Sequence, residues 1–140
     1  MSSLRWLTPL ALATAIGCSH STGPVCHPVH GQILFQDRPL ADALVVFHPL
    51  DPAADYPRPL ATTDQQGRFE LTTIQSRDGA PVGKYAIAVE HRQSRLVGEE
   101  MVRDGRNQLP PRFSKADSTP LQYTVVAGPN EVPPLKIPRR

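Results

Sequence analysis

The sequence predicts an all-β protein in which two antiparallel sheets face each other as a β-sandwich. Short segments of alternating apolar and polar residues recur along the chain, and a period of two is the signature of a half-buried strand. Turn-forming residues separate these segments, which gives six or seven short strands. The 16 prolines exclude a helical domain, because proline lacks the N–H and the free φ that a helix interior requires.

Length and composition indicate one globular domain. The 140 residues fit a single domain with short appendages. Hydrophobic residues at 39% and charged residues at 20% are typical of a folded rather than a disordered chain. A net charge of +2, without a polybasic run or a repeated aromatic platform, makes nucleic acid a poor partner.

Residues 1–17 have the order of a secretory signal peptide. Arg5 precedes an apolar run from Trp6 to Ile16, and small residues follow this run. The run is too short to span a bilayer, which takes about 20 apolar residues. We therefore expect these residues to direct export rather than to join the fold.

The segment "AIGC" resembles the bacterial lipobox, in which a diacylglycerol is attached to the cysteine and the chain is cut just before it. The cut would leave 123 residues, with Cys18 as the lipidation site and the membrane as partner. Ala15 and Ile16 depart from the usual pattern, so secretion without lipid and no processing stay open. The resemblance implies a cell-envelope lipoprotein at the outer membrane or the periplasmic face, and Ser19 favours the outer membrane.

Residues 18–28 contain serine, glycine, proline and histidine, a composition that predicts a flexible tether. The chain has two cysteines, Cys18 and Cys26. If Cys18 carries lipid, Cys26 is left to pair between chains or to stay inert in the tether. If Cys18 is free, the two thiols can form a bridge.

The first half of the domain contains two strands and a hairpin. The segment 29–35, "VHGQILF", alternates between faces, and the segment 43–49 is apolar on both faces, as in a strand covered on both sides. The segment 61–73, "ATTDQQGRFELTT", predicts a β-hairpin. Its turn runs from Asp64 to Gly67, because glycine takes the positive φ that such turns require.

The second half repeats the pattern around one long loop. Residues 84–91 and 121–128 alternate, and residues 130–138 predict an edge strand because two central prolines cannot donate to a ladder. The loop 91–120 contains a predicted helical turn at 96–102. We expect this loop, together with 51–59, to be displayed for binding.

The inward-facing side chains of these strands predict the core. Each large apolar side chain contributes about 1.5–3 kcal/mol when it is buried, which is adequate for a small domain. The predicted core is Ile33, Phe35, Val45, Phe47, Phe69, Leu71, Tyr85, Ile87, Val89, Tyr123 and Val125.

Several motifs together resemble carboxypeptidase-regulatory-like, or transthyretin-like, domains. They are the glycine at 31, the turn 38–40, "TTDQQGRF", "GKY" and the closing "LPPRF…LQYTVVAGPN". The match is closest to small secreted lipoproteins that are abundant in planctomycete bacteria. It implies a seven-stranded, prealbumin-like Greek-key sandwich over residues 29–138. Such relatives mostly have no assigned activity, which favours a non-catalytic binding or scaffolding module with an envelope protein or a glycan as partner.

A transthyretin-related hydrolase is an alternative. Hydroxyisourate hydrolases of this fold use histidines, an arginine and a C-terminal Tyr-Arg-Gly-Ser motif, whereas this sequence closes on "KIPRR". His48 and His91 could share a site with an arginine, or could be ordinary surface residues. The sequence contains no G-x-S-x-G elbow, no H-E-x-x-H pair and no P-loop.

A second alternative is a copper or zinc site at "CHPVH". Cys26, His27 and His30, with His20 nearby, offer the thiolate and imidazole ligands that these metals prefer. Their spacing matches no closed structural site. We therefore expect no cofactor and no catalytic residue, and keep the metal site as the weaker alternative.

Overall fold

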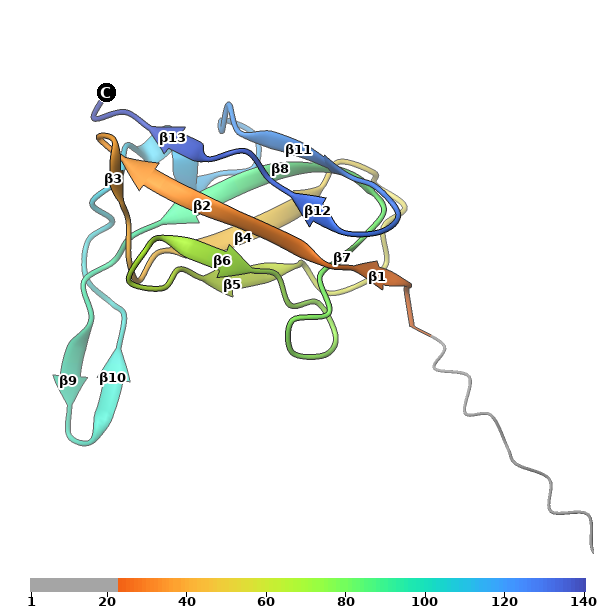
Figure 1. Ribbon diagram of the computed structural model, residues 1–140. Coiled ribbons are helices and arrows are strands. Elements are labelled where there is room, and N and C mark those ends of the chain that lie inside the picture. The colour runs from red at the N-terminus through yellow and green to blue at the C-terminus, as the bar shows by residue number, and fades with distance from the viewer. Residues whose placement is uncertain (1–22) are drawn as a thin grey trace, which may run out of the picture.

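The computed structural model describes residues 23–140 and shows two β-sheets packed face to face, which confirms the predicted all-β sandwich (Figure 1). The predicted signal peptide 1–17, the predicted lipidation site Cys18 and His20 lie outside the described residues. The described part contains thirteen strands, several of only two or three residues, where the sequence predicted six or seven short ones. The Greek-key order stays a prediction.

The first sheet is antiparallel throughout. Its order is β11 (Gln122–Val125), β8 (Gly83–Glu90), β4 (Leu44–Pro49) and β5 (Leu60–Thr62). Because β8 lies between β11 and β4, its outward residues Ala86 and Ala88 are buried as well as the inward ones. The alternation in this segment had predicted only one buried face.

The second sheet is built around β2 (Val29–Phe35). One edge of β2 pairs with β6 (Arg68–Glu70) and β3 (Arg38–Pro39), and the other pairs with β12 (Asn130–Glu131) and β13 (Leu135–Ile137).

The expectation of wholly antiparallel sheets was wrong at the last two strands. Both β12 and β13 run parallel to β2, because the turn 126–129 carries the chain from the first sheet to the second. Pro133 and Pro134 divide this segment in two, since neither can donate a ladder hydrogen bond. The predicted edge position is confirmed, because β12 and β13 pair with β2 alone.

The predicted core is buried except for Phe35 and Tyr123, which are half-buried and pack against it. Phe47 of the first sheet joins the two layers, with its ring centroid 6.2 Å from that of Phe69 and 5.7 Å from that of Tyr85. The structure adds buried residues that the sequence analysis did not assign: Val29, Leu40, Ala43, Leu109, Phe113, Val132, Leu135 and Ile137.

The predicted turn at Asp64 is present. The Gly67 N–H donates to the Asp64 carbonyl over 2.9 Å, and Gly67 adopts φ 71°. However, the two strands of this hairpin belong to different sheets, since β5 pairs with β4 and β6 pairs with β2. The segment therefore connects the layers of the sandwich.

The helical turn predicted at 96–102 was wrong. This segment is a β-hairpin of β9 (Arg95–Val97) and β10 (Glu100–Val102), with Gly98 at φ 65° in its two-residue turn. The hairpin projects from the body of the sandwich (Figure 1). Farther along, the 3-10 helix η1 (Pro111–Ser114) buries Phe113 in the core.

The predicted tether 18–28 is ordered at its end. Cys26–His27 form β1, which pairs antiparallel with β7 (Ala80–Pro81), so the last residues of this segment are part of the folded domain. Among residues 23–140, the structure contains no helix with the length and apolar character needed to cross a membrane.

Candidate anion-binding groove

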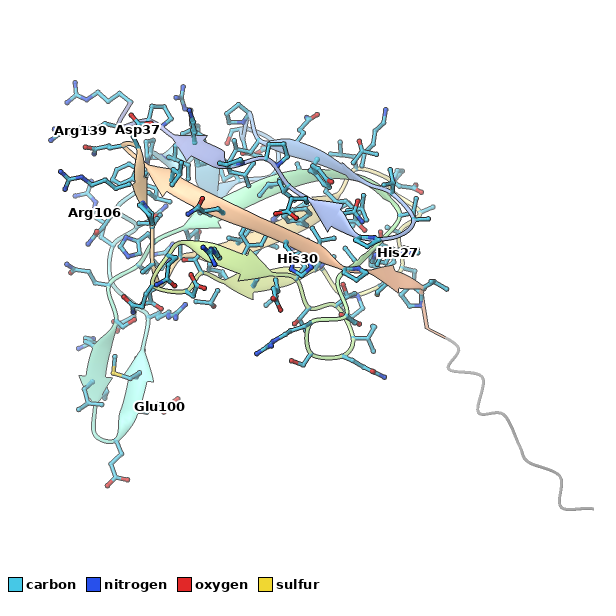
Figure 2. The ribbon with its side chains drawn as sticks, viewed as in Figure 1. His27, His30, Asp37, Glu100, Arg106 and Arg139 are labelled. Carbon is cyan, nitrogen blue, oxygen red and sulfur yellow. The ribbon has the colours of Figure 1, made fainter. Side chains whose placement is uncertain are left out.

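An open groove with a volume of about 800 Å³ lies at the end of the sandwich where β8 finishes. Two segments far apart in the sequence form it, the stretch 92–114 and Arg139 near the C-terminus. Figure 2 shows Arg106 and Arg139 at this end of the molecule. The lining contains three arginines, Arg92, Arg106 and Arg139, and no acidic side chain.

Asn107 fixes the wall of the groove. Its side-chain oxygen accepts hydrogen bonds from the His91 N–H over 3.0 Å and from the Leu109 N–H over 3.2 Å. The Gln108 N–H donates to the His91 carbonyl over 2.9 Å, and Leu109 is buried in the core. Because these hydrogen bonds hold the segment with Leu109 inward, Arg106 and Gln108 stay exposed.

The three arginines differ in how their charge is engaged. Arg92 contacts Glu90 at 3.1 Å and donates to the Gly105 carbonyl over 3.2 Å. The hydrogen bond and the charge of Glu90 raise the pKa of Arg92, which keeps it protonated. Arg106 and Arg139 form no ion pair with any residue that the structure describes.

Other side chains at the groove add polar groups. Gln93, Asn107 and Gln108 line it, while the Ser114 hydroxyl donates to the Pro111 carbonyl over 2.8 Å. Asp37 lies at the same end of the molecule, in the turn after β2, but does not line the groove (Figure 2). Two free guanidinium groups beside amide side chains can bind a carboxylate, sulfate or phosphate through paired N–H donors.

The structure does not bring Cys26, His27 and His30 together as a metal site. The His27 Nδ1 accepts a hydrogen bond from the Gly128 N–H over 3.0 Å, and the His30 Nδ1 lies 3.6 Å from Glu70. Burial and the nearby Asp78 raise the pKa of the Cys26 thiol. Within residues 23–140, no group of three or more His, Cys, Asp or Glu side chains could hold a metal ion.

His48 and His91 are also separate. His48 in β4 pairs with Ala86, whereas His91 follows Glu90, whose partner is Leu44. The two histidines are therefore offset by five strand positions, about 16 Å at the usual rise per residue. They do not converge on one cleft, so the shared histidine site considered for the hydrolase alternative is not present in the described residues.

The sequence analysis missed Arg106 and Arg139. Each arginine, taken alone, is typical of a solvated loop or terminus. The groove exists because β13 pairs with β2 and carries residue 139 to the end of the sandwich where segment 92–114 lies. The cluster of basic residues in "VRDGRNQLPPR" was the one local signal, and it gave no indication of the contribution from residue 139.

Comparisons with known proteins gave limited results. No family model and no curated protein matches the chain. Two solved structures resemble it. A 9R-lipoxygenase from Cyanothece PCC8801 has a TM-score of 0.48 and 17% identity, over 89% of this chain and 19% of the lipoxygenase chain.

The second solved structure is a Pseudomonas aeruginosa protein thought to bind carbohydrate. It has a TM-score of 0.44 and 19% identity, over 85% of this chain and 92% of the other. The chain thus spans about a fifth of the lipoxygenase but nearly all of the Pseudomonas protein. At these identities and scores, neither likeness bears on function.

Proposed function

We propose that this protein is a non-catalytic, lipid-anchored β-sandwich of the cell envelope that binds an acidic glycan in the arginine groove. The observation that carries the proposal is the pair of exposed arginines, Arg106 and Arg139, that form no ion pair with the described residues and line one groove. An acidic ligand would supply the negative charge that the lining lacks.

The aromatic residues favour an acidic glycan over a neutral one. Neutral sugars are usually held by exposed aromatic rings, whose faces stack on the apolar side of the sugar. Every phenylalanine and tyrosine in residues 23–140 is buried or half-buried. Recognition by charge, through carboxylate or sulfate groups along an open groove, is what the remaining side chains can provide.

The anchor rests on the sequence. The apolar run of residues 1–17 and the lipobox-like "AIGC" support export and acylation of Cys18. Acyl chains hold a protein at a membrane because each buried methylene contributes about 0.8 kcal/mol. The resemblance to carboxypeptidase-regulatory-like lipoproteins supports the same assignment.

Binding can be measured by isothermal titration calorimetry with a hexamer of galacturonate, using cellohexaose as the neutral control. Substitution Arg106→Ala or Arg139→Ala should weaken binding at least about tenfold each, since a hydrogen bond to a charged group contributes about 1.5–3 kcal/mol. Raising the salt concentration should weaken it further.

The matched control for this experiment is Arg58→Ala, because Arg58 is an exposed arginine outside the groove. This variant should bind like the unaltered protein. Equal affinity for cellohexaose, or an equal loss with Arg58→Ala, would contradict the proposed groove.

The anchor needs its own measurement. Mass spectrometry of the protein from bacterial membranes should show a diacylglyceryl group on Cys18 and loss of residues 1–17. The Cys18→Ser variant should leave the membrane fraction. An intact Met1 or an unmodified Cys18 in the membrane-derived protein would contradict anchoring.

A further inference from the structure

Three exposed valines gather at the end of the sandwich opposite the arginine groove. Val25, Val82 and Val126 have exposed fractions of 74%, 56% and 54%. They come from three segments: the residues before β1, the bend between β7 and β8, and the turn after β11. We call this surface the valine end.

Strand register explains why these valines are neighbours. Cys26 pairs antiparallel with Pro81, so the residues just beyond them, Val25 and Val82, lie at the same end of this strand pair. Val125 pairs antiparallel with Gly83, which brings Val126 to the other side of Val82 in the same way. Figure 1 shows β1, β7 and the turn after β11 at one end of the molecule.

The segments that carry the valines are uncharged. Residues 23–25, 81–83 and 126–129 contain glycine, proline, alanine and valine only. Charged residues begin at the border, with Lys84 directly after Gly83 in β8 and Asp78 beside Cys26. An apolar surface surrounded by polar residues is typical of a contact site rather than of a surface that stays in water.

Hydrogen bonds hold these segments in place. Asn130, which is buried, accepts from the Val126 N–H over 2.9 Å and donates to the Gly128 carbonyl over 2.9 Å. The Gly128 N–H then donates to His27 in β1. The valine end is therefore a preformed surface.

The chain enters the fold at this surface. Val25 lies seven residues after Cys18. Even fully extended, seven residues span at most about 25 Å, so a lipid on Cys18 would keep the valine end close to the bilayer.

We propose that the valine end rests on the lipid surface when the protein is anchored. The inference depends on the proposed anchor, and it names the surface that the anchor brings into contact. A second copy of the chain fits less well, because three valines offer far less than the about 800 Å² per partner of a stable interface. The arginine groove, at the opposite end, then faces away from the membrane.

The chain offers a direct test because its single tryptophan, Trp6, belongs to the segment expected to be removed. Val82→Trp places one tryptophan in the valine end of the mature lipoprotein. Leu96→Trp, at a hairpin position with 66% exposure, is the matched control. Both lipoproteins would be reconstituted in phosphatidylcholine vesicles with brominated acyl chains.

The expected result is a blue-shifted emission for Val82→Trp and at least twofold quenching by the brominated lipid, with no quenching for Leu96→Trp. Equal quenching of both variants, while mass spectrometry shows lipid on Cys18, would overturn this inference and leave the anchor intact. Absence of lipid on Cys18 would overturn both. A blue shift of the Cys18→Ser, Val82→Trp protein in buffer, rising with concentration, would identify a second copy instead and overturn the bilayer contact.

Discussion

The two ends of the sandwich are held together by different interactions. At the valine end, neutral hydrogen bonds and close backbone packing join β1, β7 and the turn after β11. At the groove end, three ion pairs join the hydrogen bonds of Asn107: Arg103 with Asp42, Arg95 with Asp104, and Arg92 with Glu90. Hydrogen bonds and close backbone packing tolerate little change in geometry. Exposed ion pairs contribute about 0–1 kcal/mol each, so they allow the segments that they join to move.

This difference suits the two proposed roles. A surface that rests on lipid can be fixed, while a segment beside a binding groove gains from the ability to adjust. The β9–β10 hairpin is an extreme case, because its strands pair only with each other and Leu96, Val97 and Met101 are exposed. Segments with few buried contacts open at low free energy.

The largest expected effect on stability comes from substitution of Gly79. A methyl group on Gly79, which has φ 90°, would lie 1.7 Å from the His27 carbonyl oxygen, so Gly79→Ala must separate β1 from β7. We expect a loss of about 3 kcal/mol or more in the free energy of unfolding, measured by urea denaturation.

Gly98→Ala is the matched control, since Gly98 also has positive φ but a methyl group there meets nothing within 4 Å. It should cost only about 1–2 kcal/mol, the penalty of the left-handed conformation. Equal losses for the two variants would contradict the contrast between the ends.

Asn130 should have the next largest effect. Asn130→Ala would leave the Val126 N–H and the Val126 and Gly128 carbonyls without their partner, at a cost of about 2–3 kcal/mol. Urea denaturation measures this loss, and Gln122→Ala, at an exposed position of β11, should be nearly neutral. An unchanged stability would show that the turn after β11 does not depend on this side chain.

A substitution in the β9–β10 hairpin should change the local opening of this hairpin more than the stability of the whole protein. Arg103→Ala removes the ion pair with Asp42 and should lower the free energy of unfolding by less than about 1 kcal/mol. Trypsin should nevertheless cut faster after Arg95, as followed by mass spectrometry. Arg77→Ala removes an ion pair with Glu70 elsewhere and should leave cleavage at Arg95 unchanged.

The smallest effect concerns His48 and pH. Burial of the imidazole and the nearby Arg58 cation lower the pKa of His48 in the folded protein. Its contribution to stability is therefore complete above the unfolded pKa of about 6.5 and is lost as the pH falls from there through the folded pKa. His48→Gln should reduce the fall in the urea midpoint between pH 7.5 and pH 5.5. A steeper fall in this variant would reverse the assigned sign.

Local patterns predicted local structure well. The alternation in residues 29–35 and 84–91 identified β2 and β8, and the chemistry of Asp64 and Gly67 identified the turn. The pairing of strands was harder, because β5 and β6 join different sheets although they flank one turn. The sequence of that hairpin does not indicate which distant strand each of its two strands will pair with.

The β9–β10 hairpin and the arginine groove likewise could not be predicted from local sequence patterns. The apolar residues at 96, 97, 101 and 102 are compatible with a helical turn as well as with two strands. In the structure Leu96 pairs with Met101, so the segment forms two strands. The groove requires Arg139 beside segment 92–114, a proximity created by the β2–β13 pairing. Side chains that gather through the tertiary fold leave no period or spacing in the sequence.

The parallel pairing of β12 and β13 with β2 also governs when the protein can fold. Asn130 hydrogen-bonds to Pro28, a partner 102 positions earlier, so one edge of β2 stays open until the final strands arrive. Contacts between such distant residues form slowly because a large loop must close first. During synthesis, this edge of β2 would thus stay unpaired until nearly the whole chain has been made.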